Sequence, residues 1–106
     1  GYKANARGGI ITLKSLLCTR PTLTITVDVF NGGEVRVGAV GVDGLTPADN
    51  LQPIKATGTA IPVRFAGRRG FQSLVGRNVT LQIELKDAIV YSVGFLGDTV
   101  DVRDSA

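Results

Sequence analysis

Apolar and polar residues alternate with a period of two along much of the chain, which is typical of β-strands that bury one face. The clearest run spans Thr22 to Phe30, and its apolar positions are Leu23, Ile25, Val27 and Val29. The alternation resumes at Glu34 and continues to Val40. Between the two runs lies Asn31-Gly32-Gly33, whose residue types tolerate the positive φ of a tight turn. This pattern predicts a β-hairpin that turns at residues 31–33.

A second pair of alternating runs lies near the end of the chain. The first run has its apolar positions at Val79, Leu81, Ile83 and Leu85. Asp87-Ala88 follows, and a second apolar run extends from Ile89 to Phe95. The pattern predicts another hairpin, with its turn at Asp87-Ala88.

Weaker strand patterns occupy residues 9–13, 16–18, 61–65 and 99–102. The alternation is lost over residues 41–58, which predicts a long surface loop, and residues 67–77 predict a second connection. The polar tail from Asp101 to Ala106 is typical of a linker. We therefore expect an all-β fold, an antiparallel β-sandwich of jelly-roll type with six to eight strands, and a closed barrel is the alternative. Residues 1–106 are expected to form a single domain taken from a larger multidomain protein.

Composition agrees with one soluble core, because 106 residues with 43% hydrophobic and 20% charged side chains are ordinary for a globular domain. The net charge is +3, but the basic residues are scattered and only Arg68 and Arg69 are adjacent arginines. Nucleic-acid binders gather their cations on one face among aromatic rings, so we expect no nucleic-acid partner. No apolar run approaches the roughly 20 residues of a membrane span, so we expect no membrane partner.

The chain contains no histidine, which excludes the Ser-His-Asp triad, the Cys-His dyad and most zinc sites. Cys18 is the only cysteine, and we expect it to be a small buried side chain. The carboxylates of Glu34, Glu84 and Asp28 fall at outward strand positions, where they are solvated rather than poised for glycoside hydrolysis. We therefore expect a domain that is not an enzyme and holds no cofactor or metal. Asp43, Asp49 and Asn50 offer oxygen ligands for calcium, but these residue types are also ordinary in turns.

Residues 67–71 place two guanidinium groups beside an aromatic ring, which is a combination that can hold the carboxylate or sulfate of an acidic sugar. The alternative is that the two arginines only keep an exposed turn soluble. Tyr2, Phe71 and Tyr91 are the aromatic side chains that can lie at the surface and stack on a sugar. The alternative for Tyr91 is a partly buried ring whose hydroxyl bonds to the backbone of a loop. The candidate ligand-binding residues are Arg68, Arg69, Phe71, Asp49 and Asn50.

The segment from Arg77 to Ser92 resembles a recurring segment of bacterial glycosidase-related proteins, in which a Val-Arg-Leu-Arg-Phe type of strand precedes Lys-Asp-Ala and Leu-Tyr-Ser. Earlier segments resemble the same proteins in the same order, so the resemblance covers most of the stretch from Gly8 to Phe95. These segments are Gly8 to Thr12, Leu23 to Val29, Gly33 to Val37 through Asp43-Gly44, Pro62 to Phe65, and Leu74 to Gly76. The chain departs from the pattern at Gln82-Ile83, where an Arg and a Phe are common, and at residues 71–73, where an acidic residue is usual.

In proteins of that type the segment is a β-sandwich that follows a five-bladed propeller similar to those of invertase-like and sialidase-like glycosidases. The resemblance implies a noncatalytic accessory domain that packs against the catalytic domain of the parent chain. It transfers no functional residue to this sequence. The alternative is an independent carbohydrate-binding module, which would need exposed rings and converging polar groups at one concave site.

Overall fold

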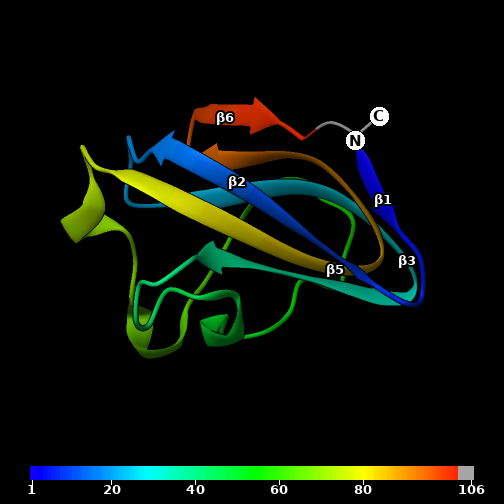
Figure 1. Ribbon diagram of the computed structural model, residues 1–106. Helices are drawn as coiled ribbons and strands as arrows, with labels where there is room; N and C mark the ends of the chain where they lie inside the picture. Colours follow the sequence, from blue (N-terminus) through cyan, green and yellow to red (C-terminus); the bar gives the residue numbers. More distant parts are fainter. Residues whose placement is uncertain (103–106) are drawn as a thin grey trace.

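The computed structural model describes residues 1–102, and residues 103–106 of the predicted polar tail lie outside that range. Six strands form one antiparallel sheet in the described part of the chain (Figure 1). They are β1 (Tyr2–Ala4), β2 (Gly9–Leu17), β3 (Leu23–Ala39), β4 (Gly58–Pro62), β5 (Asn78–Phe95) and β6 (Asp98–Asp101). Three short 3-10 turns lie between strands, namely η1 (Pro47–Asp49), η2 (Ala66–Arg68) and η3 (Gln72–Leu74). The predicted all-β antiparallel fold is confirmed.

The strands β3 and β5 form the centre of the fold and pair with each other over almost their whole length, from Leu23↔Phe95 to Ala39↔Leu81. Both strands bend at the same place. The pair Val29↔Ala88 is followed directly by Glu34↔Lys86, so residues 30–33 form a wide bulge on β3. Figure 1 shows both strands folding back at the right of the view, which brings the two halves of the sheet face to face.

The two predicted hairpins are therefore wrong. The residue types at the expected turns do adopt positive φ, with values of 51° at Asn31, 71° at Gly32 and 48° at Asp87. These conformations bend a continuous strand instead of reversing it into a paired partner, because each strand is already hydrogen-bonded to the other. A Cβ atom on Gly33 would collide with the backbone carbonyls of Lys86 and Asp87, so the bend needs glycine at this position.

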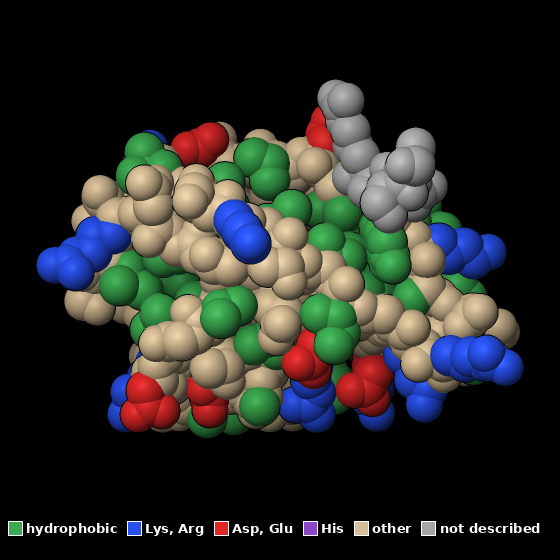
Figure 2. All heavy atoms as spheres, viewed as in Figure 1, with side chains coloured by type: hydrophobic (Ala, Val, Ile, Leu, Met, Phe, Trp, Pro, Cys, Tyr) green, Lys and Arg blue, Asp and Glu red, His purple; other side chains and the backbone are tan. Residues whose placement is uncertain are grey.

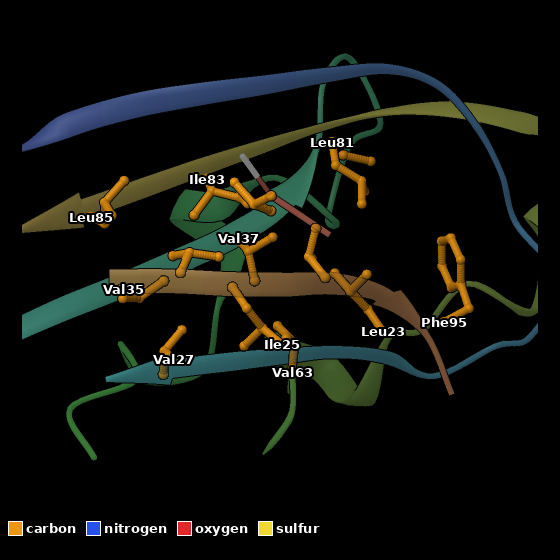
Figure 3. Close-up of a cluster of buried hydrophobic side chains, with 14 of the residues drawn as sticks. Leu23, Ile25, Val27, Val35, Val37, Val63, Leu81, Ile83, Leu85 and Phe95 are labelled. Atoms are coloured by element: carbon orange, nitrogen blue, oxygen red, sulfur yellow. The ribbon is translucent and has the colours of Figure 1, made fainter. Parts of the chain in front are cut away.

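The core lies between the two halves of the bent sheet. Leu23, Ile25 and Val27 come from the first half of β3, and the opposing side chains come from the second half of β3 and the first half of β5 (Figure 3). The labelled members of that opposing group are Val35, Val37, Leu81, Ile83 and Leu85. Inward positions alternate with outward ones along most of both long strands, as the sequence predicts. Thr24 is an exception, because it was expected to face outward and is buried.

The remaining strands border this central pair. β1 and β6 pair with the second half of β5, and β2 pairs with its first half. The two weak strands predicted at residues 9–13 and 16–18 form the single strand β2, whose register shifts around Ser15 with its φ of 56°. β4 lies at residues 58–62 instead of 61–65. The last strand begins one residue earlier than predicted. Val102, just beyond it, is buried, and its N–H donates a hydrogen bond to the Tyr91 carbonyl.

Candidate functional site

The turn at residues 66–71 sets the positions of the two adjacent arginines. Gly67 and Arg68 both adopt left-handed backbone, with φ of 72° and 57°. A non-glycine residue in this region stores strain, which is often found at functional positions. The Phe71 N–H donates to the Pro21 carbonyl at 3.0 Å and ties the end of the turn to the segment before β3. Arg68 and Arg69 are consequently held on an anchored turn, and both are exposed.

An open groove of about 720 Å³, which we name the arginine groove, lies between this turn and the end of β4. Its cations are Arg64, Arg68 and Arg69, and Gln72 adds an amide. Its other lining residues are Pro21, Thr22, Leu51, Pro62, Val63, Phe65 and Gly70, so no carboxylate lines it. Among residues 1–102 none of its arginines forms an ion pair with a carboxylate. The groove is therefore a positively charged hollow with an aliphatic wall.

Asp49 lies at the rim of this region, beside Arg69. Its carboxylate accepts hydrogen bonds from the Thr46 N–H at 3.0 Å and from Thr46 Oγ1 at 2.8 Å. These bonds hold the pKa of Asp49 below its usual value, and the charge of Arg69 adds a smaller effect in the same direction. Asp43, Asp49 and Arg69 share a hollow of about 360 Å³. Asp49 thus caps η1 and partly offsets the charge of Arg69.

The prediction that Phe71 offers an exposed ring is wrong, because the side chain is 0% exposed. Its ring packs edge to face between Phe65 and Phe95, with centroid distances of 5.8 and 5.3 Å. Anchoring of the turn at Pro21 directs the ring inward while the neighbouring arginines face outward. Phe71 therefore holds the turn in place and cannot stack on a ligand.

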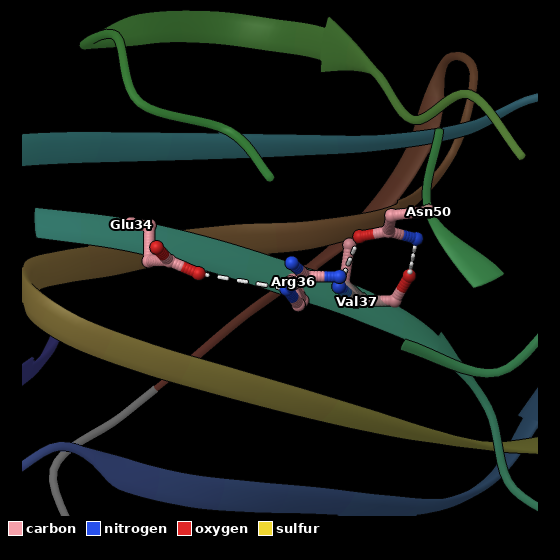
Figure 4. Close-up of polar contacts among 4 residues, drawn as sticks. All are labelled: Glu34, Arg36, Val37 and Asn50. Carbon is pink, nitrogen blue, oxygen red and sulfur yellow. Dashed lines mark hydrogen bonds and ion pairs between the residues drawn. The ribbon is translucent and has the colours of Figure 1, made fainter. Parts of the chain in front are cut away.

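The prediction that Asn50 offers its amide to a ligand is also wrong. Asn50 is 7% exposed, and its side chain pairs with the backbone of β3 (Figure 4). The Val37 N–H donates to Asn50 Oδ1 at 3.0 Å, and Asn50 Nδ2 donates to the Val37 carbonyl at 2.8 Å. Ile54 pairs with Val35 in the same way through backbone groups. The loop of residues 41–57 thereby covers the free edge of β3, which would otherwise expose unpaired backbone groups.

Tyr91 lies on the outer face of the half-sheet that the second half of β5 forms with the first half of β3, and it does not line the arginine groove. Its hydroxyl donates to Asp28 Oδ2 at 2.7 Å, and this bond raises the pKa of Tyr91. Its ring is 39% exposed, as the sequence suggested, but it is not among the residues that line the groove. Of the five candidate ligand-binding residues, the structure brings together only Arg68, Arg69 and Asp49.

A second groove, of about 700 Å³, was not predicted from the sequence. It lies over the bend of β3 and β5, and we name it the mixed-charge groove. Its cations are Arg7, Arg36 and Lys86, and Glu34 and Glu84 line it as well. Arg36 Nε lies 3.5 Å from Glu34 Oε2. The groove depends on the cross-strand pairs Glu34↔Lys86 and Arg36↔Glu84. These pairs were not predicted from the sequence, because each strand was expected to pair within its own hairpin.

No group of three or more His, Cys, Asp or Glu side chains within residues 1–102 is placed to hold a metal ion. Cys18 is buried, as the sequence suggested, and burial raises the pKa of its thiol. No helix within residues 1–102 is both long and apolar enough to cross a bilayer.

A scan against protein-family models, a search of curated proteins and a search of solved structures find no match to this chain.

Proposed function

We propose that this chain is a noncatalytic accessory domain that packs against a glycosidase-like catalytic domain of its parent protein. The observation that carries the proposal is the outer face of the half-sheet made by β2, the first half of β5 and the second half of β3. Ile10, Leu17 and Val40 stand on this face with exposed fractions of 62%, 50% and 48%. We name this surface the packing face.

The polar residues between these aliphatic side chains support a packing role. The middle positions of the packing face are Thr12, Gln82 and Thr80, which carry no charge, and residues 45–47 cover Gly38 beside them. In Figure 2, hydrophobic side chains are spread over the middle of the molecule, and most charged side chains lie along its margins. Exposed aliphatic side chains with uncharged polar residues between them are compatible with a contact between folded domains.

The proposed identity of the partner rests on a resemblance in sequence. The stretch from Gly8 to Phe95 resembles the accessory sandwiches of glycosidase-related proteins. A stand-alone sugar-binding module is favoured less, because Phe71 and Asn50 are buried and Tyr91 lies elsewhere. An enzyme is favoured least. Glycoside hydrolysis needs two carboxyl groups that flank the substrate, whereas Glu34 and Glu84 in the mixed-charge groove lie beside cations.

Thermal unfolding of the parent protein tests the proposal. We expect Leu17→Lys combined with Val40→Lys to lower the unfolding temperature of the catalytic domain, because two charges would be forced into the contact. A loss of about 2 kcal/mol would shift it by roughly 4–8 °C for a domain of 150–250 residues. Leu51→Lys is the control, since Leu51 is also exposed, at 60%, but lies outside the packing face.

The isolated chain separates this effect from simple destabilisation. Its own unfolding should change little in the double variant, because Leu17 and Val40 already face solvent there. Equal shifts in the parent and in the isolated chain would contradict the proposal. Turnover of a glycoside by the isolated chain, or a parent protein without a second folded domain, would also contradict it.

A further inference from the structure

We propose that the arginine groove binds an acidic oligosaccharide, meaning a chain of sugar rings that carries carboxylate or sulfate groups. The groove shares no residue with the packing face, so the two proposals can fail separately. The inference rests on the charge, the shape and the wall chemistry of the groove.

The charge of the groove selects an anion. Arg64, Arg68 and Arg69 line it without a carboxylate among the lining residues. A guanidinium group presents paired N–H donors that match the geometry of a carboxylate or sulfate. Arg64 and Arg68 are the more available cations. The side chain of Arg69 also lies over Gly44, and the nearby carboxylate of Asp49 partly offsets its charge. A bound oxyanion would satisfy donors that the described chain leaves without an ionic partner.

The shape of the groove selects an oligomer instead of a single small anion. Leu51, Pro62, Val63 and Arg64 also line a second hollow of about 350 Å³, so the two hollows lie side by side along these residues. Lys55 adds a cation there, and again no acidic residue is among the lining. A ligand that follows this path would place successive anionic groups beside Arg68, Arg64 and Lys55.

The wall chemistry favours sugar rings over an acidic peptide. Peptides that dock along a sheet edge need free backbone N–H and C=O groups from the edge strand. Here β4 ends in Pro62, which has no N–H, and the Ala60 N–H is already donated to Thr26 Oγ1 at 2.9 Å. The wall instead presents flat aliphatic surfaces from Pro21, Pro62 and Leu51, on which the C–H face of a sugar ring can pack.

Calorimetric titration of the 106-residue chain tests the proposal, with oligogalacturonate and sulfated dextran as acidic probes and a maltooligosaccharide as the neutral one. We expect saturable binding of at least one acidic probe and none of the neutral one. Arg64→Ala or Arg68→Ala should weaken binding by roughly tenfold or more, as loss of a charge-assisted hydrogen bond does. Arg69→Ala should weaken it less, and Arg7→Ala in the mixed-charge groove is the matched control.

Two further arms exclude trivial results. Arg68→Gly removes the cation while relieving the left-handed strain, so weaker binding by this variant cannot be attributed to unfolding. Binding should weaken as salt rises from about 0.1 M to about 1 M, because the screening length falls from roughly 10 to 3 Å. Equal losses in Arg7→Ala and Arg68→Ala, tighter binding of oligoglutamate, or no binding of either acidic probe would overturn the proposal.

Discussion

The arginine groove and the mixed-charge groove are nearly equal in volume, about 720 and 700 Å³, and each is lined by three cations. They differ in the elements that supply those cations. The mixed-charge groove lies on paired strands, where Glu34 faces Lys86 and Glu84 faces Arg36. The arginine groove is built mainly from turns and the residues that follow β4, where no cross-strand partner supplies a carboxylate.

This difference teaches that register decides whether a surface charge is available for a ligand. Opposite charges on neighbouring strands stabilise the sheet and neutralise each other locally. Charges on an anchored turn have no such partner, and the left-handed backbone at Arg68 adds strain that sheet formation does not explain. We therefore expect changes at the bend to affect stability and changes at the turn to affect binding.

The largest effect is expected from Gly33→Val, which would remove the platform of the mixed-charge groove. Any side chain at this position collides with the backbone of β5, so the free energy of unfolding should fall by about 3 kcal/mol or more. Urea unfolding measures the loss. Gly32→Ala is the control, because nothing lies near a Cβ there and only its positive φ is unfavourable, at about 1 kcal/mol. Similar losses in both variants would contradict the close approach at Gly33.

A smaller effect is expected from Asn50→Ala, which removes the side chain that covers the edge of β3. The buried N–H and carbonyl of Val37 would lose their partners, so the free energy of unfolding should fall by about 1–3 kcal/mol. Hydrogen exchange at the Val37 amide should accelerate at the same time. Gln52→Ala, at an exposed position of the same loop, is the control. Unchanged exchange at Val37 would show that Asn50 does not protect this edge.

The comparison between the grooves would be reversed by Glu34→Gln combined with Glu84→Gln. Removal of both carboxylates leaves Arg7, Arg36 and Lys86 without acidic neighbours in the mixed-charge groove. We expect this variant to gain a second, weaker site for oligogalacturonate, detected by calorimetry as a change from one site to two. If the stoichiometry does not change, the local balance of charge is not what separates the grooves.

The smallest effect concerns acid stability at the rim of the arginine groove. Hydrogen bonds from Thr46 lower the pKa of Asp49 in the folded state, so its stabilising contribution is present above the ordinary carboxyl pKa of 3.8. That contribution is lost as the pH falls through the lower, folded-state value. Asp49→Asn should therefore lower the unfolding temperature slightly at neutral pH and by progressively less as the pH falls below about 4. An equal deficit at neutral and acidic pH would contradict this assignment.

The sequence predicted the strands and their buried faces, because alternation of residues such as Leu23, Ile25 and Val27 depends only on local geometry. It did not predict which strands pair. Asn31-Gly32-Gly33 and Asp87 have the residue types of a hairpin turn, and the same types allow a strand to bend within a sheet. Only the long-range pairing of β3 with β5 distinguishes the two, and no local pattern encodes it.

Only part of the candidate site was predicted, because the rest depends on contacts between residues that lie far apart in the sequence. The adjacent arginines were evident from the sequence, whereas Arg64 and Gln72 join them only through the turn that follows β4. Asn50 and Phe71 carry ordinary ligand-binding groups, but their roles depend on an uncovered strand edge and on the rings of Phe65 and Phe95. Their residue types gave no sign of these partners.

The most direct test of the contrast between the two grooves is a set of two-dimensional ¹H–¹⁵N spectra of the chain recorded during titration with oligogalacturonate. The account predicts that saturable shifts concentrate at Arg64, Arg68, Arg69 and Gln72, and that Glu34, Arg36 and Glu84 stay unchanged. Equal shifts in both grooves, or shifts centred on the bend of β3 and β5, would contradict it.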